Sequence, residues 1–183
     1  MKKAVFLDRD GVVNEEVDYL YRPEDTLLTA TIADAVKLIH RNGRLAVVVT
    51  NQAGIARKMY TAADMESVHA RIQTLLLKHG ADAVIDAFYF CPHHPDFTGI
   101  CDCRKPAAGM LLKAGKDFDI DMANSFMIGD RMSDLKAGVA AGCRGSALVL
   151  TGYGVNEKVS AGKAGFTVAE NVLEAVKYFL PET

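Results

Sequence analysis

Two aspartates stand where an apolar run gives way to a polar turn. Asp8 and Asp10 follow the apolar run that begins at Lys3, and Gly11 comes next. Residues two apart in an extended chain point the same way, so both carboxylates can face one ligand. Like charges placed together are unfavourable unless a cation lies between them. The two acids therefore favour a cation site or a reaction that uses both carboxylates.

Three later polar segments also follow strand-like runs. They are Thr50–Gly54, Arg104–Lys105 beyond a cysteine-rich loop, and Gly129–Asp134. The hydroxyl and backbone N–H groups of the first segment, and the charge of Lys105, suit a phosphate. Asp130 adds a hard oxygen ligand of the kind that Mg²⁺ prefers beside phosphate oxygens. If these segments meet, they form a phosphate site with a metal, in which one carboxylate can attack phosphorus.

Each of these groups alone has a structural interpretation. An Asp after a strand is commonly a turn residue, Thr50 can simply end a strand, and Lys105 can be a solvated charge. Asp134 can cap the helix that follows it. Arg9 points away from its two neighbours in an extended chain, so we expect a structural or peripheral charge there. The combination at four strand ends is what favours the functional interpretation.

Three cysteines form a second cluster. Cys91, Cys101 and Cys103 lie in a loop, 91–103, that also carries His93 and His94. Three thiolates and one imidazole match a closed, four-coordinate structural zinc site. We expect His93 to be the imidazole ligand and His94 to be solvated, although the sequence alone does not choose between them.

The elements that must position these groups alternate between strand-like and helix-like patterns. Strands are predicted at Lys3–Leu7, Leu45–Val49, Asp86–Phe90, Ser125–Ile128, Ala147–Leu150 and, more briefly, Phe166–Val168. Helices are predicted from Thr31 to Asn42, from Thr61 to His79, and at Gly109–Phe118, Asp134–Ala141 and Val172–Leu180. The two threonines begin Thr-x-x-Asp patterns, so we expect a capping box at each.

Alternating helices and continuously apolar strands predict an α/β fold. We expect a Rossmann-like, doubly wound, mostly parallel sheet in three layers, with no large cap domain. Ligands bind outside the carboxyl ends of the strands in such a sheet. The fold would therefore bring the four polar segments together.

The bulk composition excludes several classes of function. The 183 residues suit a single domain over 1–183, and no apolar run is long enough to cross a bilayer. The net charge of −2 offers no basic surface for nucleic acid. Met1-Lys2-Lys3 leads straight into a strand-like run, without a signal-peptide pattern. We expect a monomeric, cytoplasmic protein that acts on a small molecule and binds neither nucleic acid nor membrane.

The chain contains, in order, four segments that resemble the motifs of the haloacid-dehalogenase-like phosphatases: FLDRDGVVN, VVVTNQAGIAR, RKPAAGM and MIGDRMSDLKAG. The resemblance covers nearly the whole chain and implies a Mg²⁺-dependent phosphoric monoester hydrolase. It implies that Asp8 is the nucleophile and that Asp10 is the general acid and then the general base. It assigns stabilisation of the transferred phosphoryl group to Thr50 and Lys105. The carboxylates of Asp8 and Asp130, with the backbone carbonyl of Asp10, would hold Mg²⁺.

The cysteine-rich loop narrows the resemblance. CPHHP and CDCRKP look like the zinc-bearing subgroup that contains the D-glycero-D-manno-heptose 1,7-bisphosphate phosphatases and the histidinol-phosphate phosphatases. RKPAAGM and TNQAGIAR are closer to the heptose enzymes, although Lys58 stands where those usually have Gly and Ala108 where they often have Pro. A zinc ion bound by Cys91, His93, Cys101 and Cys103 would be structural, holding the loop that runs into Lys105.

The resemblance implies hydrolysis of the 7-phosphate of a heptose bisphosphate through an aspartyl-phosphate, in ADP- or GDP-heptose biosynthesis. Histidinol phosphate is the alternative substrate, and a non-enzymatic, receiver-like phospho-acceptor module is the alternative from another class. Arg104 is expected to recognise the phosphorylated sugar, because its planar fork can hold a phosphate or a pair of hydroxyls. The residues expected to bind substrate are Glu16, Val17, Asp18, Tyr19, Asn51, Gln52, Ala53, Arg104 and Arg131.

Overall fold

The computed structural model describes residues 1–180, and in this range all strands join one parallel sheet in the order β3-β2-β1-β4-β5-β6. The strands are β1 (Lys3–Leu7), β2 (Arg44–Asn51), β3 (Ala87–Cys91), β4 (Phe126–Gly129), β5 (Gly145–Val149) and β6 (Thr167–Ala169). This order is that of a doubly wound fold, with β1 at the centre. The expected Rossmann-like α/β fold is confirmed, and the described residues contain no separate cap domain.

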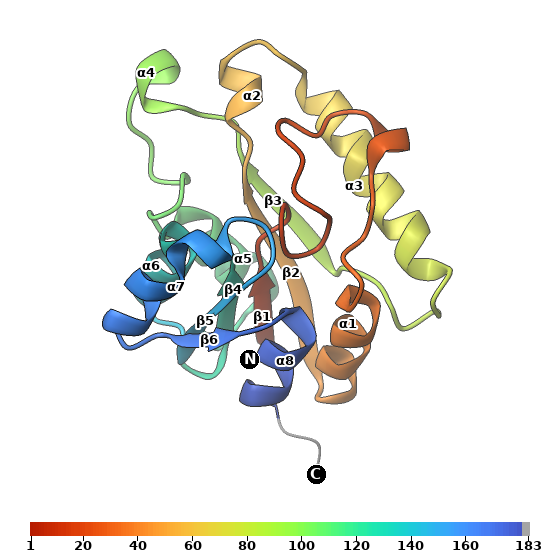
Figure 1. Cartoon of the computed structure of the whole chain (residues 1–183), viewed down its shortest axis with the longest axis vertical. Coiled ribbons are helices and arrows are strands. Elements are labelled where there is room, and N and C mark those ends of the chain that lie inside the picture. The colour runs from red at the N-terminus through yellow and green to blue at the C-terminus, as the bar shows by residue number, and fades with distance from the viewer. Residues whose placement is uncertain (181–183) are drawn as a thin grey trace.

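Helices cover both faces of the sheet, which makes three layers (Figure 1). The helices are α1 (Ile32–Arg41), α2 (Ala53–Ala56), α3 (Ala62–Leu77), α4 (Pro95–Thr98), α5 (Gly109–Phe118), α6 (Met132–Ala140), α7 (Gly154–Lys163) and α8 (Val172–Phe179). Helices α1, α3 and α8 pack on one face, and α5, α6 and α7 pack on the other. None of these helices is long and apolar enough to cross a membrane.

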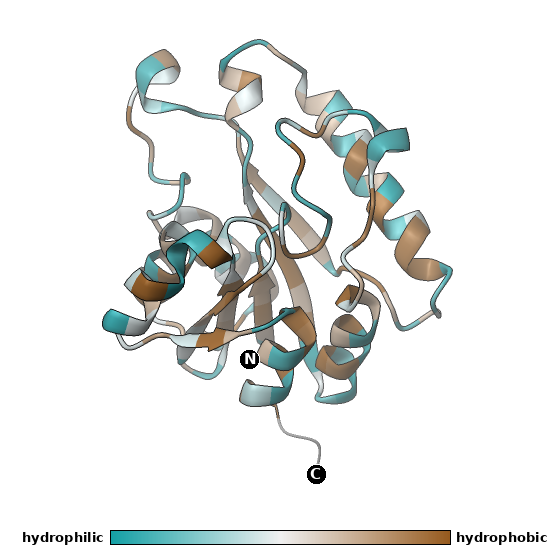
Figure 2. Ribbon diagram, in the orientation of Figure 1, coloured by the Kyte–Doolittle hydropathy of each residue, from teal (hydrophilic) through white to brown (hydrophobic). Residues whose placement is uncertain are grey.

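The strands bury both of their faces, as their continuously apolar sequences predict. Along β1, Val5 and Leu7 pack into the core beneath α1 and α8, while Ala4 and Phe6 pack into the core beneath α5. This alternation follows from the two-residue period of a strand. In Figure 2 the central strands are largely brown, which marks hydrophobic residues, whereas the helices around them carry both brown and teal segments. The central strand is therefore a fixed platform for the residues that follow it.

The expected elements agree with the observed ones to within a few residues, with two differences. Thr61 caps α3 in a capping box with Asp64, as predicted. Thr31 makes no such cap; its hydroxyl instead donates to Asn171 Oδ1 at 3.3 Å, because α1 and α8 lie side by side. The capping box predicted at Thr31 is therefore wrong. Helix α7 and the short helices α2 and α4 were not predicted.

Candidate active site

A cavity of about 390 Å³ lies at the carboxyl edge of the sheet, where the loops after β1, β2, β4 and β5 meet the segment before α5. Every residue expected to be catalytic or to bind substrate lines it: Asp8, Asp10, Glu16, Val17, Asp18, Tyr19, Thr50, Asn51, Gln52, Ala53, Arg104, Lys105 and Arg131. The lining also contains residues that the sequence did not place in the site: Arg9, Leu20, Tyr60, Ser133, Asp134 and Tyr153.

Lys105 is the buried cation at the base of this cavity. Its Nζ lies 2.8 Å from Asp8 Oδ1 and 2.8 Å from Asp134 Oδ1, and it donates to the Val49 carbonyl at 2.8 Å. Burial alone would lower the pKa of Lys105, but the Asp134 and Asp8 carboxylates outweigh burial and raise it. Lys105 is therefore a permanent positive charge that fixes the Asp8 side chain.

Asp134 does more than begin a helix. Its Oδ2 accepts the backbone N–H of Arg131 at 3.0 Å, as a cap for α6 would, while Oδ1 pairs with Lys105. Asp134 is 1% exposed, and a Cβ at position 129 would lie 2.3 Å from its Oδ2. Gly129 thus leaves the room that this carboxylate occupies. The interpretation of Asp134 as a simple cap is incomplete, since it also orients the lysine.

Arg9 does not point away from its neighbours. It is fully buried, and its Nη2 and Nε donate to Asp10 Oδ1 at 2.9 Å and 3.2 Å. Asn14 Nδ2 donates to the same oxygen at 3.0 Å. Burial would raise the pKa of Asp10, but the Arg9 charge and the hydrogen bonds from Asn14, Arg9 and Gln52 lower it. Of the two roles expected for Arg9, structural or peripheral, the peripheral one is wrong, because the chain leaves the extended conformation after Leu7, where β1 ends.

Three carboxylates form a site with the donor set of a hard divalent cation. Asp8, Asp130 and Asp134 each offer an oxygen within 4.8 Å of the others. Burial, followed by repulsion from Asp134, raises the pKa of Asp8 to about 7, although Lys105 opposes this. Burial and the Asp8 charge likewise raise the pKa of Asp130 to about 8. A cation bound beside these carboxylates would oppose both shifts, because a positive charge favours the ionised form of each acid.

One atom of this site points directly to a missing partner. Asp130 is fully buried, and its Oδ1 has no hydrogen-bond partner. Its Oδ2 accepts the Tyr153 N–H at 2.8 Å. A buried carboxylate oxygen without a partner is costly, and cation coordination satisfies it. The residues present therefore fit a divalent cation between Asp8 and Asp130, while the Asp10 carboxylate faces Arg9.

Two glycines close around Asp130. Gly11 has φ +80° and Gly152 has φ +53°, so both favour glycine. A Cβ at these positions would lie 2.5 Å and 2.3 Å from Asp130 Oδ2. The loops after β1 and β5 can therefore both approach the carboxylate that follows β4 only because neither residue has a side chain.

Asn51 and Gln52, expected to bind substrate, direct their side chains toward other site residues. Asn51 Oδ1 accepts the Lys105 N–H at 3.0 Å, and its Nδ2 donates to the Lys105 carbonyl at 3.1 Å. Gln52 Nε2 donates to Asp10 Oδ2 at 3.0 Å and to Thr50 Oγ1 at 2.8 Å. Asn51 and Gln52 thus contact three of the four residues expected to carry the chemistry, and the fourth, Asp8, pairs with Lys105.

The rim of the cavity combines acids with an arginine and a tyrosine. Burial, and then the Asp10 and Asp8 charges, raise the pKa of Glu16 to about 7. The Arg131 guanidinium lies 3.6 Å from the centre of the Tyr153 ring, and the Tyr153 hydroxyl donates to Asp18 Oδ1 at 3.2 Å. Tyr153 follows β5, whose carboxyl end lies at the same edge of the sheet as the other four. Its position after a strand end is the sequence signal that could have placed Tyr153 in the site.

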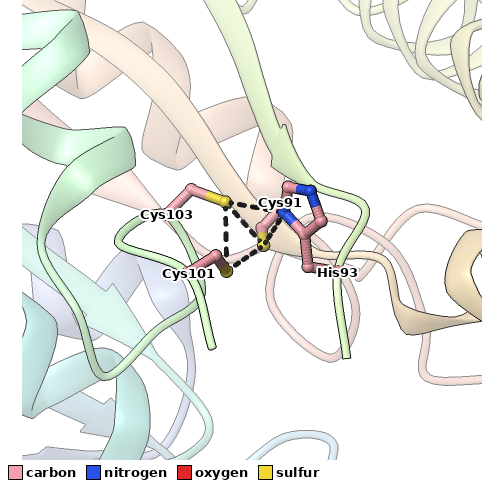
Figure 3. Close-up of side chains that lie close together, drawn as sticks. All are labelled: Cys91, His93, Cys101 and Cys103. Carbon is pink, nitrogen blue, oxygen red and sulfur yellow. Dashed lines mark hydrogen bonds between the residues drawn. The ribbon is translucent and has the colours of Figure 1, made fainter. Parts of the chain in front are cut away.

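The cysteine cluster is compact (Figure 3). Cys91 Sγ lies 3.6 Å from Cys101 Sγ and 2.8 Å from Cys103 Sγ, and His93 Nδ1 lies 3.3 Å from Cys103 Sγ. Ligands of a tetrahedral zinc ion with Zn–S bonds near 2.3 Å lie about 3.8 Å apart, so the four side chains need only a small expansion. They therefore fit a closed, four-coordinate zinc ion. His94 lies outside the cluster, where its Nδ1 accepts the Asp96 N–H at 3.3 Å.

The cluster is joined to the cavity by the segment that follows it. Arg104 Nη1 donates to the His93 carbonyl at 3.1 Å, and the Gly109 N–H donates to the Asp102 carbonyl at 2.9 Å. A Cβ at position 109 would lie 2.3 Å from that carbonyl oxygen, so Gly109 permits α5 to begin against the loop. The loop geometry therefore determines where Arg104 and Lys105 lie.

Comparison with known proteins gives the same family from sequence and from structure. The HAD-hydrolase-like family model matches residues 102–175. The chain is 40% identical over 163 residues to the D-glycero-beta-D-manno-heptose-1,7-bisphosphate 7-phosphatase of Yersinia pestis, with 86% of each protein covered. The chain belongs to this family of HAD-like phosphatases.

Two further members of the family support the assignment. The D-glycero-D-manno-heptose-1,7-bisphosphate 7-phosphatase of Thermosynechococcus vestitus is 42% identical over 161 residues, which cover 84% of this chain and 81% of that protein. The crystal structure of D,D-heptose 1,7-bisphosphate phosphatase from B. bronchiseptica, complexed with magnesium and phosphate, matches with a TM-score of 0.88 and 33% identity, covering 99% of both chains. The expected HAD-like phosphatase is confirmed, and the receiver-like alternative is set aside.

Proposed function

We propose that this chain hydrolyses the 7-phosphate of D-glycero-D-manno-heptose 1,7-bisphosphate. The observation that carries the proposal is the Asp8 carboxylate, held 2.8 Å from Lys105 at the base of a cavity and beside the unpartnered Asp130 Oδ1. Family membership supports the heptose substrate, and the remaining 1-phosphate would suit activation to an ADP- or GDP-heptose. Histidinol phosphate stays the alternative.

Mg²⁺ is the cation proposed for the carboxylates of Asp8 and Asp130, together with the backbone carbonyl of Asp10. When bound, it supplies the positive charge that lets a phosphate dianion approach a carboxylate. The magnesium in the B. bronchiseptica structure supports this choice. With that charge in place the Asp8 carboxylate is ionised, which a nucleophile requires.

The proposed reaction has two steps on the side chains of this chain. Asp8 attacks phosphorus, the bond from phosphorus to the ester oxygen breaks, and Asp10 gives a proton to that oxygen. A water molecule then attacks the aspartyl-phosphate, the bond from phosphorus to Asp8 breaks, and Asp10 takes the proton of the water. The Thr50 hydroxyl and the Lys105 ammonium stabilise the phosphoryl oxygens in both steps.

The remaining cavity residues are proposed to hold the sugar and its second phosphate. Arg104 and Arg131, which both line the cavity, supply cationic forks, and Glu16 and Asp18 supply acceptors for hydroxyl groups. Zn²⁺ in the cysteine cluster is proposed to be structural: it holds the loop that carries Arg104 and takes no part in the reaction.

Phosphate release tests this function. We expect Mg²⁺-dependent multiple turnover on both anomers of heptose 1,7-bisphosphate, with lower kcat/KM on histidinol phosphate. Asp8→Asn should abolish turnover, whereas Asp34→Asn, an exposed aspartate of α1, should leave it unchanged. A higher kcat/KM on histidinol phosphate would overturn the substrate, and full activity in Asp8→Asn would overturn the mechanism.

A further inference from the structure

The side chain of Gln52 is 3% exposed, and all of its hydrogen-bonding atoms have partners. Its Nε2 donates to Asp10 Oδ2 at 3.0 Å and to Thr50 Oγ1 at 2.8 Å, while its Oε1 accepts the Tyr60 hydroxyl at 2.5 Å. An ionised carboxylate only accepts, so the nitrogen end of the carboxamide must face Asp10. Both N–H groups of this side chain are therefore in use, and only one lone pair of the buried Oε1 is left.

The two oxygens of Asp10 are not equivalent. Oδ1 accepts three N–H bonds, two from Arg9 and one from Asn14. Oδ2 accepts one, from Gln52. Three donors occupy the lone-pair sites of Oδ1, so Oδ2 is the oxygen available to give or take a proton. The direction in which Oδ2 faces therefore depends on Gln52.

Tyr60 is itself held in place. Tyr60 is 7% exposed, and its ring stacks on that of Tyr21 with the ring centres 5.9 Å apart. A Cβ at position 54 would lie 2.1 Å from the Tyr60 ring. Gly54 thus allows the ring to lie against the turn after β2. Because the ring is held on two sides, its hydroxyl is already positioned to donate to Gln52.

We propose that Gln52 and Tyr60 are positioning residues for proton transfer. The Tyr60 hydroxyl orients the Gln52 carboxamide, which holds Asp10 Oδ2 and Thr50 Oγ1 in fixed directions. The proton on Oδ2 then passes to the ester oxygen as its bond to phosphorus breaks. This inference rests on the proposed function of Asp10, and it gives the side chain of Gln52 a role in addition to the substrate binding expected for this residue.

The test compares two phosphate esters whose leaving groups differ in how much they depend on protonation. A simple alkyl phosphate has a poor leaving group that must be protonated, whereas the p-nitrophenolate of p-nitrophenyl phosphate leaves without much help. We expect Gln52→Met to lower kcat/KM for the alkyl ester roughly 10-fold more than for the aryl ester. Tyr60→Phe keeps the ring and should shift the ratio in the same direction by less. Inhibition by inorganic phosphate should weaken much less than kcat/KM falls for the alkyl ester, because Gln52 reaches a bound phosphate only through Thr50.

The controls separate positioning from general damage. Gln73 is a glutamine outside the cavity whose side chain bonds only the Ile85 backbone, so Gln73→Met should leave the ratio of the two esters unchanged. Tyr60→Phe serves as the measure if Gln52→Met fails to fold, as judged by circular dichroism. Asp10→Asn calibrates the assay, because it should show the largest preference for the aryl ester.

Three results would count against the inference. Equal losses on both esters in the Gln52 and Tyr60 variants would show that they do not act through the proton. A weaker inhibition by phosphate with an unchanged ratio would return Gln52 to substrate binding. If Asp10→Asn itself lost activity equally on both esters, the proposed function of Asp10 would fail first, and the inference would fall with it.

Discussion

Arg9 is a fully buried charge at the centre of the molecule, and its neighbours explain how it is tolerated. It makes two hydrogen bonds to Asp10, and its Nη1 lies 3.5 Å from His69 Nε2. His69 also stacks on Phe88, with ring centres 4.3 Å apart. A second buried cation beside Arg9 would be strongly unfavourable, so His69 must remain neutral and accept from Arg9.

His69 should make the protein sensitive to acid. Burial, and then the Arg9 charge, lower the pKa of His69 from its ordinary value of 6.5 to about 3. Between pH 6.5 and pH 3, His69 is therefore protonated in the unfolded chain but neutral in the folded protein. The free energy of unfolding falls as the pH drops through this range. The loss from His69 alone is roughly 2 kcal/mol between pH 7 and pH 5.

His69→Gln checks this, since Gln can still accept from Arg9 and does not titrate. Urea unfolding at pH 7 and pH 5 should show a smaller loss of stability in the variant than in the parent protein. His79→Gln, at an exposed position, is the matched control and should retain the parent's loss. A parent-like loss in His69→Gln would mean that another group carries the acid sensitivity.

At the scale of elements, the short helix α2 ends in a motif that normally requires glycine. The Met59 N–H bonds to the Gly54 carbonyl at 2.9 Å and the Lys58 N–H bonds to the Ile55 carbonyl at 3.0 Å, which together form a Schellman motif. Lys58 has φ 58°, in the left-handed region. This is the position where the heptose enzymes usually have Gly, so the difference at Lys58 places strain in the backbone.

Lys58→Gly should therefore stabilise the protein. Removing the left-handed strain is partly offset by the greater freedom of glycine in the unfolded chain, which leaves a gain of roughly 0.5–1 kcal/mol. Lys58→Ala removes the same charge but keeps the strain, so it should give no gain. Chemical denaturation of the two variants measures the difference. A gain in the alanine variant would show that the lysine charge, and not the backbone, is responsible.

The strands and most helices were predictable because their signals are local. The apolar run of β1 and the Gly109 start of α5 agree with the structure to the residue. The failures have non-local causes: Thr31 has the capping pattern but bonds Asn171 of a distant segment instead. Helix α7 gave no periodic signal, because Val155 and Val159 are exposed and Gly162 interrupts it.

The members of the site were predictable, but their contacts were not. Strand ends brought Asp8, Thr50 and Lys105 to one cavity, as the parallel sheet required. The direction of Arg9 depends on how the loop after β1 bends back, and the extended-chain rule does not apply there. Tyr60 reaches the site through a tertiary contact with Gln52 that no sequence spacing reports.

At the scale of the molecule, the loop from β3 to α5 joins the cysteine cluster to the cavity. We expect Cys103→Ser to release zinc, to lower the melting temperature by several degrees and to reduce kcat/KM, because Arg104 and Lys105 lose their anchored loop. Metal content by mass spectrometry, a thermal melt and turnover measure the three effects. Cys143→Ser lies outside the cluster and should keep the zinc and the activity.

A structural zinc ion would make these three effects occur together. A variant that released zinc with unchanged stability and turnover would show that the loop needs no metal. Lost turnover with an unchanged melt would instead indicate a direct part in the reaction.

The glycines around Asp130 also determine when the site can exist during synthesis. Asp8 directly follows the first strand, yet the wall of the proposed cation site includes Gly152, which lies beyond the fifth strand. The ribosome must synthesise β4 and β5 before the N-terminal carboxylates can be enclosed. Contacts between residues so far apart in sequence form late in folding. The aspartate proposed as the nucleophile is therefore made early, whereas the residues that enclose it are made late. The proposed site can be completed only after most of the chain has been synthesised.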